Sequence, residues 1–377
     1  MSWQSIIGQK RITTQLQNII LNKQVAQAYC IYGGEGVGQD SISIEFVRSL
    51  LCKDSPANSC GKCKNCEMIS KFTHPNLYLL YSIPTPKNGK DSAKESEGNI
   101  SQPEKIKKEI QKELQEKSLN PYHKMEIDGA NSILIEQVRD LQKNFVSLST
   151  YAEGNRFIII FNADEMNEVS SNALLKVLEE PSTNTIFILT TSRIDGLLPT
   201  IISRCQLLRC DPLSIEEIKI ALEREFNTPS QQAILLAKLA NGSYSKAIEL
   251  QSSDLEEERS NAMKTLEIII NSSLNEMISH ISKVITEFDK NRITAKNHLF
   301  LIYYLLRDML MLKEENPNLI INSDYLPKLD IIKNKIQDNY CEAGMNQCEK
   351  SIELLESYVY LPLVFYSFAI KLRRIFN

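Results

Sequence analysis

The sequence predicts an α/β fold, with a parallel β-sheet in the first 210 residues and helices in the remainder. Short apolar runs alternate with longer segments of helical period in the first part, and each run is continuous rather than alternating. Continuous apolar strands separated by helices are typical of a parallel sheet that is covered on both faces. After Pro212 this strand pattern stops, and a chain of 377 residues is long enough for two or three domains.

Four predicted strands and two predicted helices define the first part. The strands are residues 28–32, 77–81, 156–161 and 185–191. Apolar residues recur at helical spacing in residues 6–21 and 132–146. This organisation is typical of a nucleotide-binding α/β domain, which we place at residues 1–210.

An insertion at about residues 84–125 interrupts the alternation. Its first part, residues 87–99, is charged and contains Ser and Gly, which predicts an exposed, flexible segment. In residues 103–117, apolar side chains recur every four positions, and two acidic residues each stand four positions before a lysine. The apolar residues are Ile106, Ile110 and Leu114, and the predicted ion pairs are Glu104 with Lys108 and Glu113 with Lys117. We interpret this part as a solvated surface helix with a narrow apolar stripe.

The remaining residues predict two helical domains. Residues 211–252 form a small one, with helices at 214–225 and 229–240 and a C-terminal cap at Asn241-Gly242. Residues 253–377 are helical in period throughout, including the very apolar segments 299–311 and 354–375. Apolar stripes on several helices predict a bundle, and we expect part of it to contact neighbouring subunits.

Composition narrows the classes of function. The formal net charge is −4, so the chain has no general surface for coating nucleic acid, and contact with DNA requires a local patch or a partner. No apolar run approaches the roughly 20 residues that span a bilayer, and the first residues lack the basic and apolar regions of a secretion signal. We therefore expect a cytoplasmic protein that does not enter a membrane.

A glycine-rich loop follows the first predicted strand and precedes a helix. It matches the phosphate-binding template G-x-x-x-x-G-K-[ST] in its glycines, Gly33, Gly36 and Gly38 among them. Gln39 replaces the lysine that would reach the β- and γ-phosphates, and Asp40 replaces the hydroxyl residue that would bind Mg²⁺. We expect this loop to keep its shape without binding or hydrolysing ATP. Binding without hydrolysis stays open, because the glycines persist.

Four of the nine cysteines form a cluster in the sequence, Cys52, Cys60, Cys63 and Cys66. Four thiolates at these spacings suit a tetrahedral, structural Zn²⁺. An iron–sulfur site of this kind would call for a further Cys-Pro soon after the last cysteine, and the chain has none there. The sequence therefore predicts a structural zinc module at residues 52–66.

The segment Asn172-Ala173-Leu174-Leu175-Lys176-Val177-Leu178-Glu179-Glu180-Pro181 resembles a helix of the bacterial clamp-loader AAA+ family, the gamma/tau and delta-prime subunits of DNA polymerase III. Other segments resemble the same family in order, over residues 1 to about 250. They are the opening at residues 3–9, the approach to the glycine-rich loop at 27–29, the helix at 135–141, and the segment 242–247, where Ser245 replaces a nucleotide-sensing arginine. The family also carries a structural zinc module with the same Cys-Gly-x-Cys-x-x-Cys core.

The resemblance implies that the second ATP-site motif is degenerate as well. Counting back from the matching helix places Phe161 and Asn162 on the family's Asp-Glu positions. A working site needs those carboxylates to hold Mg²⁺ and to position water. The acidic pair Asp164-Glu165 lies three residues too late in this register, so we expect no intrinsic ATPase activity.

Ser203, Arg204 and Cys205 match the Ser-Arg-Cys motif of the family. The resemblance implies that Arg204 points out of its own subunit into the ATP site of a neighbour. Arginine suits that role, because its planar guanidinium stays charged and grips phosphate oxygens in a fixed geometry. An arginine that caps or bridges elements within its own domain is the simpler alternative.

The resemblance thus implies a delta-prime-type subunit with an AAA+ domain, a lid at residues 211–252 and a collar at 253–377. Such a subunit would join gamma/tau and delta subunits and, through the assembled complex, load the sliding clamp on primed DNA. Its tasks would be to scaffold the loader and to donate Arg204. Two alternatives stay open, an active gamma/tau-type ATPase and a zinc-containing, nucleotide-binding regulatory protein.

Overall fold

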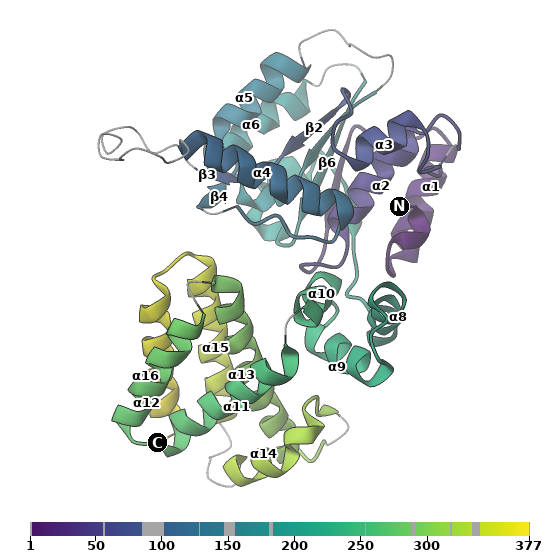
Figure 1. Ribbon diagram of the computed structural model, residues 1–377. Coiled ribbons are helices and arrows are strands. Elements are labelled where there is room, and N and C mark those ends of the chain that lie inside the picture. Colours follow the sequence, from purple (N-terminus) through teal and green to yellow (C-terminus); the bar gives the residue numbers. More distant parts are fainter. Residues whose placement is uncertain are drawn as a thin grey trace, which may run out of the picture. The chain divides into compact units, whose positions relative to one another are not determined.

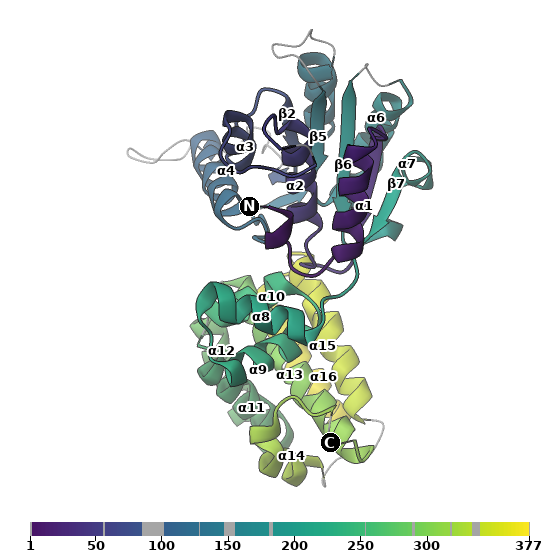
Figure 2. The ribbon, with the colours of Figure 1, turned by 90° about the vertical axis from the view of Figure 1, so that its right-hand side faces the viewer.

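The computed structural model describes most of the chain and divides it into two compact units, Met1–Ile248 and Glu249–Asn377 (Figures 1 and 2). The described residues are 2–55, 57–84, 102–127, 129–146, 155–180, 184–252, 254–288, 291–316, 319–333 and 340–376. The predicted flexible segment at residues 87–99 and Pro181 of the family-like helix lie outside them.

The predicted parallel sheet is confirmed in the first unit. Its five strands lie in the order β2-β5-β6-β1-β7, and each pairs in parallel with its neighbours. They are β1 (Ala28–Tyr32), β2 (Leu77–Leu80), β5 (Arg156–Ile160), β6 (Thr185–Thr191) and β7 (Gln206–Arg209). The sequence did not predict β7, because this edge strand has only two apolar residues, Leu207 and Leu208, and two neighbouring leucines give no strand pattern. Only Leu208 is buried. A separate two-stranded antiparallel sheet joins β3 (Ile83–Pro84) to β4 (Ala130–Ser132).

Helices cover both faces of the five-stranded sheet. One face packs against α1 (Lys10–Leu21), α2 (Gln39–Leu51) and α3 (Lys64–Ser70). The other packs against α5 (Ile135–Asp140), α6 (Glu168–Glu179) and α7 (Pro199–Ile202). Residues of β5 alternate between these two cores, so every residue of the strand is buried. Each large apolar side chain buried here contributes about 1.5–3 kcal/mol of transfer free energy.

Two predicted helices begin later than the apolar period indicated. Residues 3–5 form a separate short 3₁₀ helix, and α1 begins only at Lys10, because Gln9 takes a left-handed conformation with φ of 53°. In the second case Ser132 ends β4, and α5 begins at Ile135. From Leu141 to Val146 the helix continues with the wider π geometry.

The helix in the insertion, α4 (Gln102–Leu119), lies mostly at the surface, as the sequence predicted, but two of its charged side chains are buried. Its Lys117 side chain is only 1% exposed, and Glu113 is buried as well. The predicted Glu113–Lys117 ion pair is wrong: Glu113 Oε2 lies 2.8 Å from His123 Nε2, and Lys117 Nζ lies 2.7 Å from Asp40 Oδ2. The chain that follows α4 folds back over these residues, so each charge finds a tertiary partner in place of its helical neighbour.

Three lid helices complete the first part of the chain, α8 (Ile215–Phe226), α9 (Ser230–Ala240) and α10 (Tyr244–Ser252). Ser214 caps α8 reciprocally with Glu217, which fixes the start of that helix. Asn241 ends α9 in the left-handed conformation, with φ of 47°. The first two helices agree with the predicted ones to within a residue at each end.

The second unit is a helical bundle, as the sequence predicted. Its helices are α11 (Leu255–Asn271), α12 (Leu274–Glu287), α13 (Arg292–Lys313), α14 (Leu326–Lys333), α15 (Tyr340–Glu356) and α16 (Leu361–Phe376). Helix α13 packs against α11 and α15, and α15 packs against α16 (Figure 2). None of the helices in the described ranges combines the length and apolar character that crossing a membrane requires.

One apolar segment of this unit, residues 354–375, is not a single helix. Helix α15 ends at Glu356, and Tyr358 takes a left-handed conformation with φ of 58°. Pro362 then lies in the first turn of α16, where its missing N–H has no helical partner to lose. Cys341 and Cys348, which the sequence placed in a polar stretch, are fully buried on α15.

His298 gives the second unit a predictable dependence on pH. Its Nε2 lies 3.1 Å from Thr265 Oγ1, which also lies 2.9 Å from His280 Nε2. Burial, and secondarily His280, lowers the pKa of His298 to about 3. Below about pH 6.5 the imidazole binds a proton in the unfolded chain but stays neutral in the folded chain. The free energy of unfolding therefore has its full value above about pH 6.5 and decreases as the pH falls toward 3.

Between pH 7 and pH 5, we expect the free energy of unfolding of the second unit to fall by about 2 kcal/mol more in the wild type than in a His298→Leu variant. Chemical denaturation of both proteins at the two pH values measures this difference, and the carboxylates that they share cancel in the comparison. Equal pH dependence in both proteins would show that the imidazole takes up its proton without unfolding.

Candidate functional site

The glycine-rich loop lies between β1 and α2, at the carboxyl end of the parallel sheet, where nucleotide sites of α/β proteins are found. The Gln39 side chain does not point away from the loop. Its Nε2 donates to the carbonyl oxygens of Gly33 at 3.0 Å and Gly34 at 2.8 Å, and the residue is buried. Gln39 therefore closes the loop on itself and, being uncharged, provides no cation at the template's lysine position.

The tip of this loop contacts the lid directly. Gly36 has φ of +73°, and a Cβ added there would collide with the side chains of Ser243 and Ser245. Its carbonyl oxygen accepts the backbone N–H of Tyr244 at 3.0 Å and that of Ser245 at 3.3 Å. Only glycine allows the backbones to approach this closely, so Gly36 permits the contact between the loop and the lid.

Asp40, at the template's metal-binding position, has both carboxylate oxygens in use. Oδ1 accepts the hydroxyl of Thr190 at 2.7 Å, and Oδ2 lies 2.7 Å from the ammonium of Lys117. Thr190 Oγ1 in turn accepts the backbone N–H of Asn162 at 3.3 Å. This chain of contacts connects the loop to the carboxyl ends of both β5 and β6.

Lys117 is a residue of this site that sequence reasoning assigned only to a helical ion pair. Its Nζ also donates to the His123 carbonyl at 2.7 Å and lies 4.9 Å from the centre of the Phe161 ring. A fully desolvated ammonium needs partners of this kind, because burying an unpaired charge is very unfavourable. No pattern within α4 identifies Lys117, since its partners lie far away in sequence.

Tyr122, from the same insertion, is a second residue that sequence reasoning missed. Its hydroxyl accepts the backbone N–H of Ile7 at 2.8 Å, and its ring lies edge-on to Tyr244 with centroids 4.9 Å apart. Its carbonyl oxygen accepts the hydroxyl of Ser245 at 2.6 Å. Burial raises the pKa of Tyr122, which keeps the phenol neutral. One buried residue thus connects the N-terminal segment with the lid.

The acidic residues near the end of β5 take part in other contacts. Asp164 accepts the Thr191 hydroxyl at 2.6 Å and pairs with Arg193 at 3.0 Å, and Glu165 accepts the hydroxyl of Ser82. Burial raises the pKa of Glu165. Both carboxylates hold local structure together, as expected if they are not part of a metal site.

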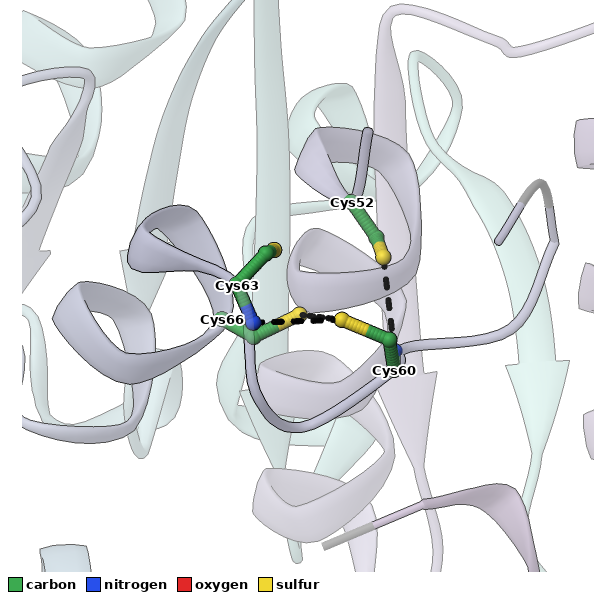
Figure 3. A group of neighbouring side chains, drawn as sticks. All are labelled: Cys52, Cys60, Cys63 and Cys66. Atoms are coloured by element: carbon green, nitrogen blue, oxygen red, sulfur yellow. Dashed lines mark hydrogen bonds between the residues drawn. The ribbon is translucent and has the colours of Figure 1, made fainter. Parts of the chain in front are cut away.

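The four clustered cysteines meet in space, as the sequence predicted (Figure 3). Cys52 follows α2, Cys60 and Cys63 lie on the connecting loop, and Cys66 is on α3. Their sulfur atoms all lie within 4.8 Å of one another. In a regular tetrahedron with Zn–S bonds of about 2.3 Å, the sulfurs are about 3.8 Å apart, and Cys60 Sγ lies 3.9 Å from Cys66 Sγ. The cluster can therefore hold a metal ion.

Backbone N–H groups surround these sulfurs as they would surround thiolates. The N–H of Cys60 donates to Cys52 Sγ at 3.3 Å, and the N–H of Cys63 donates to Cys60 Sγ at 3.2 Å (Figure 3). Desolvation is the largest single effect on Cys63 and raises its pKa, but several hydrogen bonds, chiefly from Cys66 and Cys60, together outweigh it and lower the pKa to about 7. Burial raises the pKa of Cys66 to about 12, so this thiol needs a bound cation to ionise at neutral pH.

Two buried contacts join the cysteine module to the rest of the unit. The indole N–H of Trp3 donates to the carbonyl of Ala57 at 2.8 Å. On α2, Glu45 Oε1 accepts the hydroxyl of Ser59 at 2.6 Å, and Ser59 Oγ also accepts from Arg48 at 2.9 Å. Glu45 and Arg48 are at most 2% exposed, so the module rests on a desolvated ion pair.

Arg204 lies in the turn between α7 and β7 and is exposed. Its guanidinium donates to the Thr200 carbonyl at 2.9 Å and to Glu179 Oε1 at 2.7 Å. Glu179 ends α6, which is the helix that carries the family resemblance, and it is exposed as well. Cys205 is partly buried against the core, and burial raises its pKa to about 11. Arg204 is therefore held at the surface by weak contacts that a competing anion can displace.

Comparisons with known proteins identify relatives of this chain. A sequence model of the family described as DNA polymerase III, delta subunit, matches residues 8–214, more than half of this chain. The delta-prime subunit of DNA polymerase III from Bacillus subtilis is 28% identical over 330 residues, which are 86% of this chain and 84% of that protein. The tau subunit from Escherichia coli is 28% identical over 254 residues, 65% of this chain and 32% of tau. The gamma-subunit-related protein of Thermotoga maritima superposes over 97% of this chain and 99% of its own, at 16% identity and a TM-score of 0.42.

Proposed function

Because this chain belongs to the delta-prime family of DNA polymerase III clamp-loader subunits, we propose that it is an ATPase-inactive subunit of such a loader. It would assemble with gamma/tau and delta subunits, and the complex would load the sliding clamp on primed DNA. The helical bundle at residues 253–377 would provide the collar that holds the subunits together. The chain itself would be a scaffold and would complete the ATP site of a neighbour.

One observation carries this proposal: the chain has an intact Ser203-Arg204-Cys205 motif, but its own glycine-rich loop lacks the catalytic groups of the template. Arg204 is exposed, and within the described part of the chain its guanidinium bonds to the Thr200 carbonyl, four residues before it, and to Glu179, at the end of α6. A guanidinium in this state can exchange a single carboxylate for the phosphates of a neighbour, which carry more negative charge and accept in a bidentate manner.

The loss of ATPase activity is proposed from four positions. The side-chain amide of Gln39 donates to loop carbonyls, and the charge of Asp40 is neutralised by Lys117. Phe161 and Asn162 replace the two carboxylates that would hold Mg²⁺ and orient water. Positioning and electrostatic stabilisation supply nearly all of the rate in phosphoryl transfer, so these losses together remove the reaction.

We also propose that the cysteine module holds Zn²⁺ with Cys52, Cys60, Cys63 and Cys66. Four sulfur ligands leave no open coordination position, so the metal would stabilise the fold and would not activate water. The ligand set of four thiolates, without carboxylate or imidazole, favours zinc over magnesium or calcium.

The isolated chain should show no ATP hydrolysis above the rate of buffer, with or without primed DNA. Restoring the template lysine by Gln39→Lys should leave the rate at background, because Asp40, Phe161 and Asn162 remain. A phosphate-release assay with a gamma/tau subunit as positive control measures both. Turnover by the unaltered chain would assign it to the active gamma/tau type.

Assembly is measured on the same preparation by mixing the chain with gamma/tau and delta subunits and following the complex by size-exclusion chromatography. Stable incorporation supports the loader assignment. A chain that stays free of both subunits would favour the alternative of a zinc-containing regulatory protein.

A further inference from the structure

The insertion brings residues to the glycine-rich loop that correspond to the parts of a bound nucleotide. Helix α4 reaches α2 from a part of the chain some 80 residues away, and the turn after it lies against the loop and the lid (Figure 1). Glu113 holds this turn in place, because its carboxylate accepts the N–H of Glu126 at 3.0 Å and contacts His123. The segment is therefore a fixed part of the site.

Lys117 provides the positive charge that a metal ion would provide. In the template, the hydroxyl at the position of Asp40 binds Mg²⁺, and an acidic residue at the position of Phe161 completes the metal site. The Lys117 ammonium lies 2.7 Å from the Asp40 carboxylate and 4.9 Å from the Phe161 ring. Asp40 and Phe161, the two residues that disable a metal site, therefore both favour an ammonium. Asp40 attracts it by its charge, and Phe161 by the face of its ring.

Tyr122 provides the buried aromatic ring that a base would provide. Three separate contacts surround it: the Ile7 amide on its hydroxyl, Gly38 against its ring, and Tyr244 of the lid edge-on to it. A Cβ at Gly38 would lie 3.2 Å from the Tyr122 ring, so the loop glycine is packed directly on the aromatic group. The Tyr122 ring is thus bound at its polar edge by a backbone amide and packed between the loop and the lid.

We infer that residues 102–125 occupy this chain's own nucleotide site and hold the lid against the AAA+ domain in place of a nucleotide. Lys117 neutralises the loop, and Tyr122 connects the N-terminal segment, the loop and the lid. The lid position is then constant through the ATP cycle of the complex. This inference rests on contacts within the chain and holds whether or not Arg204 acts on a neighbour.

The first test is direct binding of a fluorescent ATP analogue to the isolated full-length chain in the presence of Mg²⁺. We expect no saturable binding at concentrations up to about 1 mM, the upper end of the range in which enzymes bind substrates. Saturable binding of one analogue per chain at micromolar concentration would overturn the inference, because the site would then be free.

The second test asks whether the insertion holds the lid, by hydrogen exchange of individual backbone amides. In Tyr122→Ala, the amides of Tyr244 and Ser245, which bond to Gly36, should exchange at least about tenfold faster than in the wild type. In Tyr122→Phe, which keeps the ring, only the amide of Ile7 should become faster, since it alone loses an acceptor. The Phe variant keeps the test informative if the Ala variant does not fold.

The matched control is Lys112→Ala, an exposed lysine on the same helix, and it should leave all three amides unchanged. Lys117→Met should accelerate hydrogen exchange of the backbone amides of the glycine-rich loop, because it leaves the Asp40 carboxylate without its partner. Adding Asp40→Asn should partly reverse this acceleration, because both charges are then removed together. Wild-type exchange at Tyr244 and Ser245 in both Tyr122→Ala and Lys117→Met would show that the insertion covers the site without holding the lid, and would overturn the inference.

Discussion

Removal of zinc should unfold the cysteine module at residues 52–66 and strongly destabilise the first unit. Loss of a structural metal belongs to the few changes that exceed about 4 kcal/mol, because four thiolates that lie close together lose their shared cation at once. Cys63→Ser should have the same effect, and since Cys63 is only partly buried, serine there opens no cavity in the core. Metal analysis should find about one zinc per wild-type chain and none in the variant.

The chain contains its own reporter of this event. Trp3 is the only tryptophan, it is buried, and its indole N–H bonds to Ala57 within the module. Chelation should therefore shift tryptophan emission to longer wavelength as the ring becomes hydrated, before the rest of the unit unfolds. Adding zinc back should restore the emission if the module refolds.

Cys348→Ala is the control, because this cysteine lies in the second unit and, like Cys66 of the module, is fully buried. It should lower stability by the cost of a small cavity and leave zinc content and tryptophan emission unchanged. A wild-type chain that contains no zinc, or contains iron, would contradict the assignment of the metal. Unchanged emission after complete chelation would show that the metal does not support the module.

The features that the sequence predicted well are those that depend on residues close together in the chain. Unbroken apolar runs such as residues 185–191 predict a strand covered on both faces, and Thr185–Thr191 is buried at every position. Cysteine spacing predicted the thiolate cluster for a similar reason, since three of its four members lie within seven residues. Both signals need no knowledge of distant parts of the chain.

The features that sequence reasoning missed depend on tertiary contacts. The charges of α4 looked like helical ion pairs, because Glu113 and Lys117 have the right spacing, but Lys117 is bound to Asp40 across 77 residues. The contact of Glu179 with Arg204 was missed in the same way, although each residue was noticed in its own motif. One feature of the sequence did point to the α4 contact. An aspartate at position 40 is unfavourable in a loop that binds phosphates, and its presence is explained by a lysine nearby.

In a reconstituted loader, Arg204→Ala should sharply reduce the ATPase rate stimulated by clamp and DNA, while folding, zinc content and assembly stay normal. Arginine fingers contribute on the order of 10³ to 10⁵ in rate at one site. In the proposed loader one ATP site would border this subunit, so total turnover should fall in part, and should fall almost completely only if the sites fire in an obligatory sequence. Arg204→Lys should rescue little, because an ammonium lacks the planar guanidinium.

Two further variants separate a trans-acting role from a structural one. Arg11→Ala removes an exposed arginine that, like Arg204, bonds to one carbonyl and one carboxylate, those of Arg209 and Asp211, and it should leave the rate unchanged. Glu179→Gln removes the partner that holds Arg204 in the isolated chain, at a stability cost of about 0–1 kcal/mol for an exposed pair. If Arg204 acts on a neighbour, Glu179→Gln keeps most of the activity that Arg204→Ala loses. If Arg204 only ties the end of α6 to the turn before β7, the two variants lose the same activity, and the chain is a scaffold alone.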